Sequence, residues 1–238
     1  MLHWNVHSWR DAAGAPNVDA VAALIRDTKP HAVSLVEVNE PWGAPAALVE
    51  VADRCGYSWI FSPALEFGAA ESARGYGNAL LTRVPVTAVQ QWRVFAPSRS
   101  YDGSEPAEPR ALIAARLPFA GGSLWLGSTH FPAGDASARK VAATELRRVT
   151  NQLTSPWIVC GDFNDPPAKC FADRGDLLVS PDPARPTFPA HQPRAAIDYC
   201  LASPGLFLRS EVLPTHGSDH LPLLTLARDR FRRAKIGS

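Results

Sequence analysis

The stretch IVCGDFNDPP, residues 158–167, places two carboxylates and a carboxamide directly after an apolar segment. The apolar residues Ile158 to Cys160 are typical of a buried strand, and Pro166 and Pro167 prevent that strand from continuing. A polar turn is one explanation of this pattern. The other explanation is an active site at the carboxyl end of a core strand.

Several other predicted strands end in polar residues that a hydrophobic core does not need. A single His or Asp near a strand end is most often a satisfied turn residue. Glu37 is different, because it directly follows the apolar run AVSLV, where a carboxylate needs a partner such as a metal ion. The complete set contains carboxylates, amides and histidines but no cysteine, which is typical of a site for a hard cation and phosphate. Its members are Asn5, His7, Glu37, His130, Asp162, Asn164, Asp198, Asp219 and His220.

The elements that position these residues alternate between helix and strand early in the chain and form hairpin-like strands in its middle. Helices are predicted over 17–30, 45–56 and 137–153 from their apolar periodicity. Strands are predicted over 31–38, 57–61, 76–83, 86–95, 110–117, 123–131, 157–161, 196–202, 210–214 and 221–227. Two long loops are predicted at 62–75 and 97–109. This order predicts an α/β fold, a four-layer sandwich of two mainly antiparallel sheets packed face to face with helices outside.

Composition limits the domain count and the partners. The chain has 238 residues, of which 46% are hydrophobic, enough for one large domain. Residues 227–238 carry five basic residues and one aspartate, a net charge of +4, so the total of +1 leaves −3 on the other 226 residues. We predict a single domain over 1–226 and a basic C-terminal tail over 227–238. A slightly acidic body is not a broad clamp for duplex nucleic acid.

The sequence contains no run of about eighteen apolar residues, so no stable membrane insertion is expected. The N-terminus has no basic region followed by an apolar run, which predicts a cytoplasmic protein unless a signal has been removed. The four cysteines form no CxxC motif and are predicted to be buried thiols in a reducing compartment, with two disulfides as the alternative. No protein partner is predicted.

Ordered motifs along nearly the whole chain resemble the endonuclease/exonuclease/phosphatase superfamily, which has the deoxyribonuclease I-like fold. GDFN and SDH, in this order and at this separation, are together a specific signal. The motifs are WNVHSW at 4–9, LVEV at 35–38, GYGNALLTR at 75–83, STHF at 128–131, GDFND at 161–165, TFP at 187–189, IDYCLAS at 197–203 and GSDHLPL at 217–223.

The resemblance implies a metal site and a hydrolytic water. Glu37 would be the principal ligand of Mg²⁺ or Mn²⁺, and Asn5 and Asp219 would complete its inner or water-mediated shell. Asp162 would orient or deprotonate the attacking water, and Asn164 would hold that water or the phosphate. A cation and positioned donors supply most of the catalysis in phosphoryl transfer, which agrees with this division of roles.

The resemblance also implies histidine donors to the phosphate. His220 and His130 would donate to phosphate oxygens, and Asp198 would fix the orientation of one of these rings. His7 departs from the pattern, because some relatives carry a second acidic metal contact there, so the number of metal ions stays open.

Four residues are predicted to contact the substrate, namely Arg110, Tyr76, Asn78 and His7. Arg110 opens a strand after the loop at 97–109, where several relatives use a basic residue on the substrate. The alternative for Arg110 is a surface salt bridge, and for Tyr76 a packed aromatic ring.

We therefore predict a Mg²⁺-dependent phosphoesterase, with a phosphodiester of DNA or RNA as the first choice of substrate. A small phosphorylated metabolite or a phospholipid headgroup is the alternative. A non-catalytic binding protein on the same fold ranks last, because Glu37, Asp162, Asn164, Asp219 and His220 are all present.

A zinc site at His216 and His220 is disfavoured. Their H-x₃-H spacing places both rings on the same face only in a helix. Gly217, Ser218 and Pro222 argue against a helix there.

Overall fold

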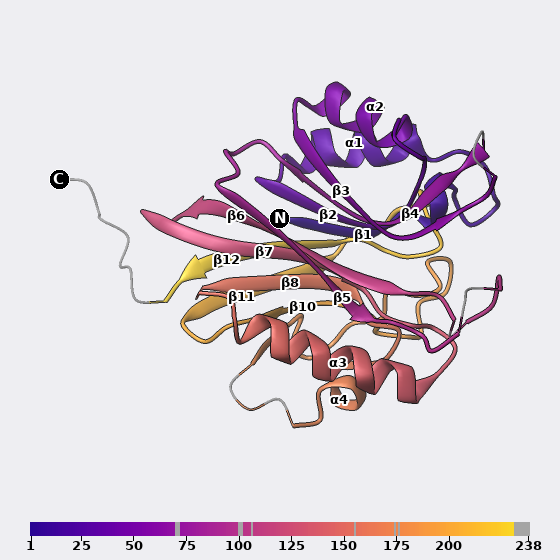
Figure 1. Ribbon diagram of the computed structural model, residues 1–238. Helices are drawn as coiled ribbons and strands as arrows, with labels where there is room; N and C mark the ends of the chain where they lie inside the picture. The colour runs from indigo at the N-terminus through magenta and orange to yellow at the C-terminus, as the bar shows by residue number, and fades with distance from the viewer. Residues whose placement is uncertain are drawn as a thin grey trace.

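The computed structural model describes residues 1–69, 72–99, 102–105, 107–154, 156–173, 175 and 177–230. Within these ranges two six-stranded sheets pack against each other, and helices cover the outer face of each sheet (Figure 1). The predicted four-layer α/β sandwich is confirmed.

The first sheet has the strand order β11-β12-β1-β2-β4-β3. Its strands are β1 (Leu2–Asn5), β2 (Ala32–Pro41), β3 (Ser58–Phe67), β4 (Arg74–Thr82), β11 (Leu206–Val212) and β12 (Leu223–Asp229). Only β1 and β2 among these neighbours are parallel in the described chain. Helix α1 (Val18–Thr28) joins them and packs with α2 (Ala47–Cys55) on the outer face, above β1 and β2 (Figure 1).

The second sheet has the order β5-β6-β7-β8-β10-β9. Its strands are β5 (Ala88–Phe95), β6 (Arg110–Phe119), β7 (Gly122–His130), β8 (Trp157–Asp162), β9 (Leu178–Ser180) and β10 (Asp198–Ala202). Again only one described pair, β7 and β8, is parallel. Helix α3 (Ala136–Thr150) joins this pair and covers the outer face, with the short α4 (Pro167–Cys170) beside it (Figure 1).

Each sheet therefore contains one β-α-β unit at its centre, and these two units position the polar residues. Parallel strands end at the same edge of a sheet. The carboxyl ends of β1 and β8 meet across the interface, because the Asn5 amide donates to the Asp162 carboxylate over 3.1 Å. The polar residues of both sheets thus converge at one end of the sandwich.

The helix ends follow local sequence signals. Helix α2 ends at Gly56, whose φ of 73° is in the left-handed region that favours glycine. Helix α3 begins where the Asp135 carboxylate accepts a hydrogen bond from the Ser137 backbone N–H over 2.7 Å. Strands bury the apolar faces between the sheets, with Leu80, Ile113 and Ile158 in the central layer.

The predicted loop at 62–75 is wrong, because β3 continues to Phe67 and β4 starts at Arg74. Because β3 is an edge strand, it tolerates Pro63, which has no N–H to donate to the ladder. The sequence interpretation also missed α4 and β9.

The cysteine prediction is wrong for one pair. Cys160 on β8 lies directly opposite Cys200 on β10, and the two form a disulfide, whereas Cys55 and Cys170 are free thiols. The sequence indicated both strands but not the register that brings these residues together.

The boundary of the predicted tail also moves. Strand β12 continues through Asp229, so the start of the segment 227–238 belongs to the sheet, and residues 231–238 lie outside the described residues. No helix in the described ranges is long and apolar enough to cross a membrane.

Candidate active site

Asp162 lies at the carboxyl end of β8 and is 1% exposed. Its Oδ1 accepts a hydrogen bond from the Asn164 backbone N–H over 2.9 Å, and its Oδ2 accepts from Asn5 Nδ2 over 3.1 Å. Asn164 has a φ of 54°, a left-handed conformation that Asn tolerates better than most residues. The turn after β8 and strand β1 therefore fix both oxygens of this carboxylate.

Glu37 reaches the same site through an irregularity in β2. The pairing of β2 with β4 shifts register between Leu35 and Val38, and Glu37 has a φ of 57°. Such a bulge re-aims a side chain out of the regular alternation. Glu37 Oε1 accepts a hydrogen bond from Asn5 Nδ2 over 3.0 Å, so the Asn5 amide bridges the carboxylates of Glu37 and Asp162.

Asn5 presents its nitrogen, and not its oxygen, to these carboxylates. Its Oδ1 accepts from the backbone N–H of His7 over 3.0 Å. His7 opens a turn of three residues with positive φ values, and its Nδ1 lies 3.7 Å from Asp219 Oδ1. His7 and Asp219 thus form a partly exposed pair beside Asn5, and their predicted metal and substrate contacts stay predictions.

Candidate ligand atoms for a divalent cation gather in two groups. One ligand atom each from Glu37, His130 and Asp162 lie within 4.8 Å of one another, and so do those of Asp162, Asp198 and His220, but the second group could bind a cation only with an unprotonated His220 ring. Burial, followed by repulsion from Asp198, raises the pKa of Asp162 to about 7. Carboxylates that share a buried space with too little positive charge fit a cation, because it would relieve their repulsion.

His220 and Asp198 form a buried ion pair. His220 Nδ1 donates to Asp198 Oδ2 over 2.8 Å, and the Thr187 hydroxyl donates to the same oxygen over 2.6 Å. Burial lowers the pKa of His220, but Asp198 and Asp162 outweigh this effect and raise it to about 10. The ring is therefore a cation at neutral pH, and its Nε2 lies 3.6 Å from Asp162 Oδ2.

His3 is a site residue that the sequence interpretation missed. It is 1% exposed, its Nδ1 lies 2.9 Å from the Ser34 hydroxyl, and its Nε2 lies 3.5 Å from Asp198 Oδ1. His3 and Asn5 are two residues apart on β1 and therefore point to the same face. This alternation in the segment LHWN was the available signal.

Arg110 forms a second buried cluster at the start of β6. It is 3% exposed, it pairs with Glu105 and Glu108, and its Nη1 lies 3.1 Å from His130 Nδ1. Its guanidinium carbon lies 5.9 Å from the centre of the Tyr76 ring. The alternative of a surface salt bridge is wrong, because Arg110 is buried where it pairs with the glutamates, and the predicted substrate contact stays a prediction. Neither glutamate was among the predicted site residues.

Asn78, a predicted substrate residue, is buried between the sheets. Its side chain is 2% exposed and donates to the backbone carbonyl of Ala111 over 2.8 Å. It therefore joins β4 to β6 between the sheets. The zinc alternative fails, because residues 216–220 are not helical and His216 is exposed whereas His220 is buried.

Comparisons with known proteins agree with this geometry. The sequence model of the Endonuclease/Exonuclease/phosphatase family matches residues 2–220. The chain belongs to this family. No curated protein matches the sequence.

Several solved structures share the fold. A family protein from Bacteroides thetaiotaomicron has a TM-score of 0.75 at 17% identity, with 96% of this chain and 97% of that chain covered. A mannosyl-6-phosphatase from Bacteroides thetaiotaomicron VPI-5482 has a TM-score of 0.74 at 16% identity, covering 95% and 98%. D. rerio TDP2 complexed with a single-strand DNA product has a TM-score of 0.68 at 16% identity, covering 95% and 96%.

The sequence motifs of this family member converge on one site. The structure brings Asn5, Glu37, His130, Asp162, Asn164, Asp198 and His220 into one cluster. Family membership supports hydrolysis of phosphate esters.

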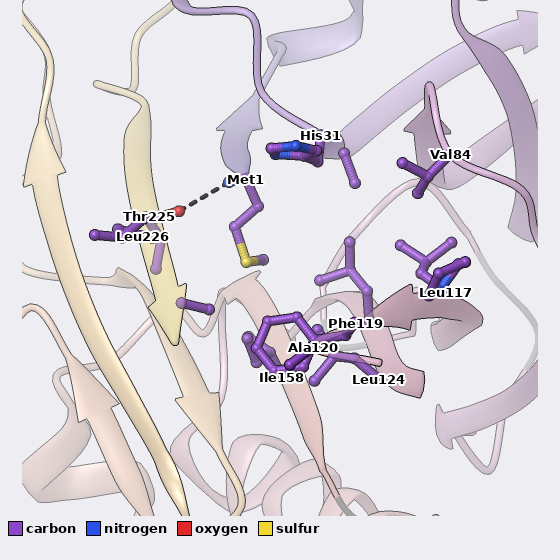
Figure 2. A pocket seen from close by; sticks show the side chains of 14 residues that line it. Met1, His31, Val84, Leu117, Phe119, Ala120, Leu124, Ile158, Thr225 and Leu226 are labelled. Carbon is purple, nitrogen blue, oxygen red and sulfur yellow. Dashed lines mark hydrogen bonds between the residues drawn. The ribbon is translucent and has the colours of Figure 1, made fainter. Parts of the chain in front are cut away.

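An apolar pocket of about 340 Å³ lies at the other end of the sandwich (Figure 2). Met1, Ala32, Leu124 and Ile158 line it, and these residues lie at or near the amino ends of the same strands that carry the cluster at their carboxyl ends. None of the predicted site residues lines this pocket. The polar cluster and this apolar pocket are therefore separate features of the fold.

Proposed function

We propose that this protein hydrolyses phosphate esters with a divalent cation, Mg²⁺ or Mn²⁺, and with Asp162 as the base that takes a proton from water. The observation that carries the proposal is the environment of Asp162, a buried carboxylate held by Asn5 and Asn164 and flanked by two histidines. A pKa of about 7 suits a general base near neutral pH.

The residues that would hold the cation are Glu37 and Asp219, with Asn5 keeping Glu37 and Asp162 in place. A bound divalent cation supplies electrostatic stabilisation of charge on the phosphate oxygens. His220, as a cation oriented by Asp198, donates its Nε2–H to a phosphate oxygen. Stabilisation of the spread negative charge is the main demand of phosphoryl transfer.

The substrate has two candidate classes. A phosphodiester of DNA or RNA is the class predicted from sequence, and a small phosphorylated metabolite or a phospholipid headgroup is the second. The buried Arg110 cluster favours the second class, because the cation expected to bind substrate is already paired with Glu105 and Glu108. Nucleic-acid binding depends on basic groups that neutralise several phosphates.

The test compares metal-dependent hydrolysis of single-stranded DNA, plasmid duplex, a chromogenic phosphate monoester and the matching diester. EDTA treatment and the variants Asp162→Ala and Glu37→Ala are the controls. We expect metal-dependent turnover that both substitutions reduce by at least about 10³-fold while circular dichroism stays unchanged. Near-wild-type turnover in either variant would contradict the mechanism. Hydrolysis of the nucleic acids, without hydrolysis of the small esters, would contradict the preference for a small substrate.

A further inference from the structure

The contact between Arg110 and His130 fixes where the imidazole carries its proton. Arg110 Nη1 lies 3.1 Å from His130 Nδ1, and the two residues are 3% and 4% exposed. A guanidinium can donate hydrogen bonds but cannot accept them. His130 Nδ1 must therefore present its lone pair to Arg110.

The same contact makes the ring of His130 neutral, because an imidazole that accepts a hydrogen bond at Nδ1 cannot carry a proton on both nitrogens. A neutral imidazole carries one N–H. Since Nδ1 accepts from Arg110, that proton lies on Nε2.

Asn164 offers the opposite arrangement. Its Nδ2 lies 3.1 Å from His130 Nε2, and donation there would place the ring proton on Nδ1, against the Arg110 cation. The charged donor wins this competition, because hydrogen bonds from ionised donors are roughly twice as strong as neutral ones. The Asn164 amide also has another acceptor, the Phe131 carbonyl at 2.9 Å.

We infer that Arg110 is a positioning residue that holds His130 in the Nε2–H tautomer, and that His130 Nε2–H and the Asn164 amide together form a two-donor site for one phosphate oxygen. Two N–H groups 3.1 Å apart cannot bond to each other, and the Asp162 carboxylate oxygen lies 3.7 Å from His130 Nε2. The Nε2–H of His130 and the second amide hydrogen of Asn164 can therefore both donate to an oxygen of the substrate. The role of this pair toward phosphate rests on the proposed function, whereas the tautomer does not.

Glu105 and Glu108 keep Arg110 in this role. Glu108 accepts from both terminal nitrogens of the guanidinium, over 3.2 and 3.1 Å, and Glu105 accepts a further hydrogen bond from Nη2. Such forked pairing fixes the plane of the guanidinium and directs one N–H at His130. Arg110 thus acts through His130 and does not contact the substrate itself.

The first experiment measures the tautomer directly by NMR of ¹⁵N-histidine-labelled protein at neutral pH in EDTA. The spectrum of His130→Asn assigns the His130 signals by their absence. We expect the wild-type ring to be neutral and protonated on Nε2. A ring protonated on Nδ1, or on both nitrogens, overturns the inference, and this readout needs neither substrate nor metal.

The second experiment compares Arg110→Lys with Arg110→Met. Lysine keeps a cationic donor and should retain the Nε2–H tautomer, whereas methionine removes the donor and should shift the ring toward Nδ1–H. With the substrate found above, Arg110→Met should lower kcat by on the order of 10²-fold with KM changed less than about threefold, and Arg110→Lys should recover much of that loss.

The matched control is Arg139→Met, which also removes a mostly buried arginine from an ion pair, here with Asp165, without touching His130. It should leave the tautomer unchanged. An unchanged tautomer in Arg110→Met, or a raised KM with unchanged kcat, overturns the inference. If the wild-type protein hydrolyses none of the tested substrates, the proposed function fails while the NMR result still decides the tautomer.

Discussion

Replacing Asp162 by Asn should abolish hydrolysis and make the metal-free protein relatively more stable as the pH rises. Asp162 is 1% exposed, and its pKa is raised from 3.8 to about 7 by burial and by Asp198. The ionised carboxylate is therefore an unfavourable group in the metal-free fold. Asparagine keeps the shape of the side chain and removes the charge.

The sign of the effect follows from proton binding. Between pH 3.8 and 7 the folded protein holds a proton on Asp162 that the unfolded chain releases, so the free energy of unfolding falls as the pH rises through this window. Roughly three pKa units at about 1.4 kcal/mol each give about 4 kcal/mol as the upper limit of this loss. The Asn variant has no such proton, so its stability relative to wild type rises by up to that amount.

A second effect of the substitution does not depend on pH. The amide nitrogen of the new side chain cannot accept from Asn5 Nδ2, and an unmatched buried donor costs about 1–3 kcal/mol. This cost lowers the stability of the variant at every pH. The quantity to measure is therefore how the difference in unfolding free energy between Asp162→Asn and wild type changes with pH, and not its value at one pH.

The assay is urea unfolding of both proteins in EDTA at several values from about pH 4 to about pH 8. Asp135→Asn is the control for a flat response, because hydrogen bonds from Ser137 lower the pKa of the partly exposed Asp135 below its usual 3.8. Its titration therefore lies below this pH range, and the difference in unfolding free energy from wild type should stay nearly constant. The reasoning would be refuted if the unfolding free energy of Asp162→Asn, minus that of wild type, stayed constant or fell as the pH rises.

Three further outcomes are expected. The value of kcat/KM should rise with pH as Asp162 loses its proton, at a pH below its metal-free pKa of about 7 because the bound cation favours the ionised carboxylate. It should fall at high pH as His220, whose pKa is raised to about 10, loses its own proton, and a flat pH–rate profile contradicts both roles. The stability of Glu108→Gln relative to wild type should rise from about pH 4 to about pH 9, because burial raises the pKa of Glu108 to about 8 and wild-type stability is lost as pH rises through that value. The lost acceptor for Arg110 lowers the stability of the variant at every pH, so the change with pH is the test, and a difference in urea midpoint that stays constant between the two pH values would exclude this. Gly161→Ala should lower the free energy of unfolding by about 2–4 kcal/mol, because a Cβ there would lie 2.5 Å from the Thr129 carbonyl oxygen, and an unchanged melting temperature would show that β8 can shift.

The site residues that could be predicted from the sequence are those that stand within a recognisable local pattern. Asp162 and Asn164 stand in one turn, and a strand followed by GDFND and two prolines shows both the strand and its end. Glu37 could be predicted because an acid after a long apolar run is unusual. The sandwich itself followed from the order of helices and strands, because that order leaves few ways to bury the apolar faces.

The missed features depend on contacts between distant segments. The Cys160–Cys200 disulfide needs the register of β8 against β10, which no local pattern gives. His3 becomes a site residue only because the two sheets bring it to Asp198. Arg110 was predicted to contact the substrate, with a surface salt bridge as the alternative, and no local pattern showed that the loop before it supplies the two glutamates that pair with it.

The two histidines beside Asp162 show why those distant contacts decide the chemistry. Their Nε2 atoms lie 3.6 and 3.7 Å from the same Asp162 oxygen, so position alone does not distinguish them. The partner behind each ring does: Asp198 makes His220 a cation, and Arg110 keeps His130 neutral. Two cations would hold Asp162 ionised and make it a weak base, whereas two neutral rings would leave its pKa higher still. Burial and the Asp198 charge raise the pKa of Asp162, and the single cation His220 lowers it, so that the pKa is about 7. The different partners of the two histidines therefore set the basicity of Asp162.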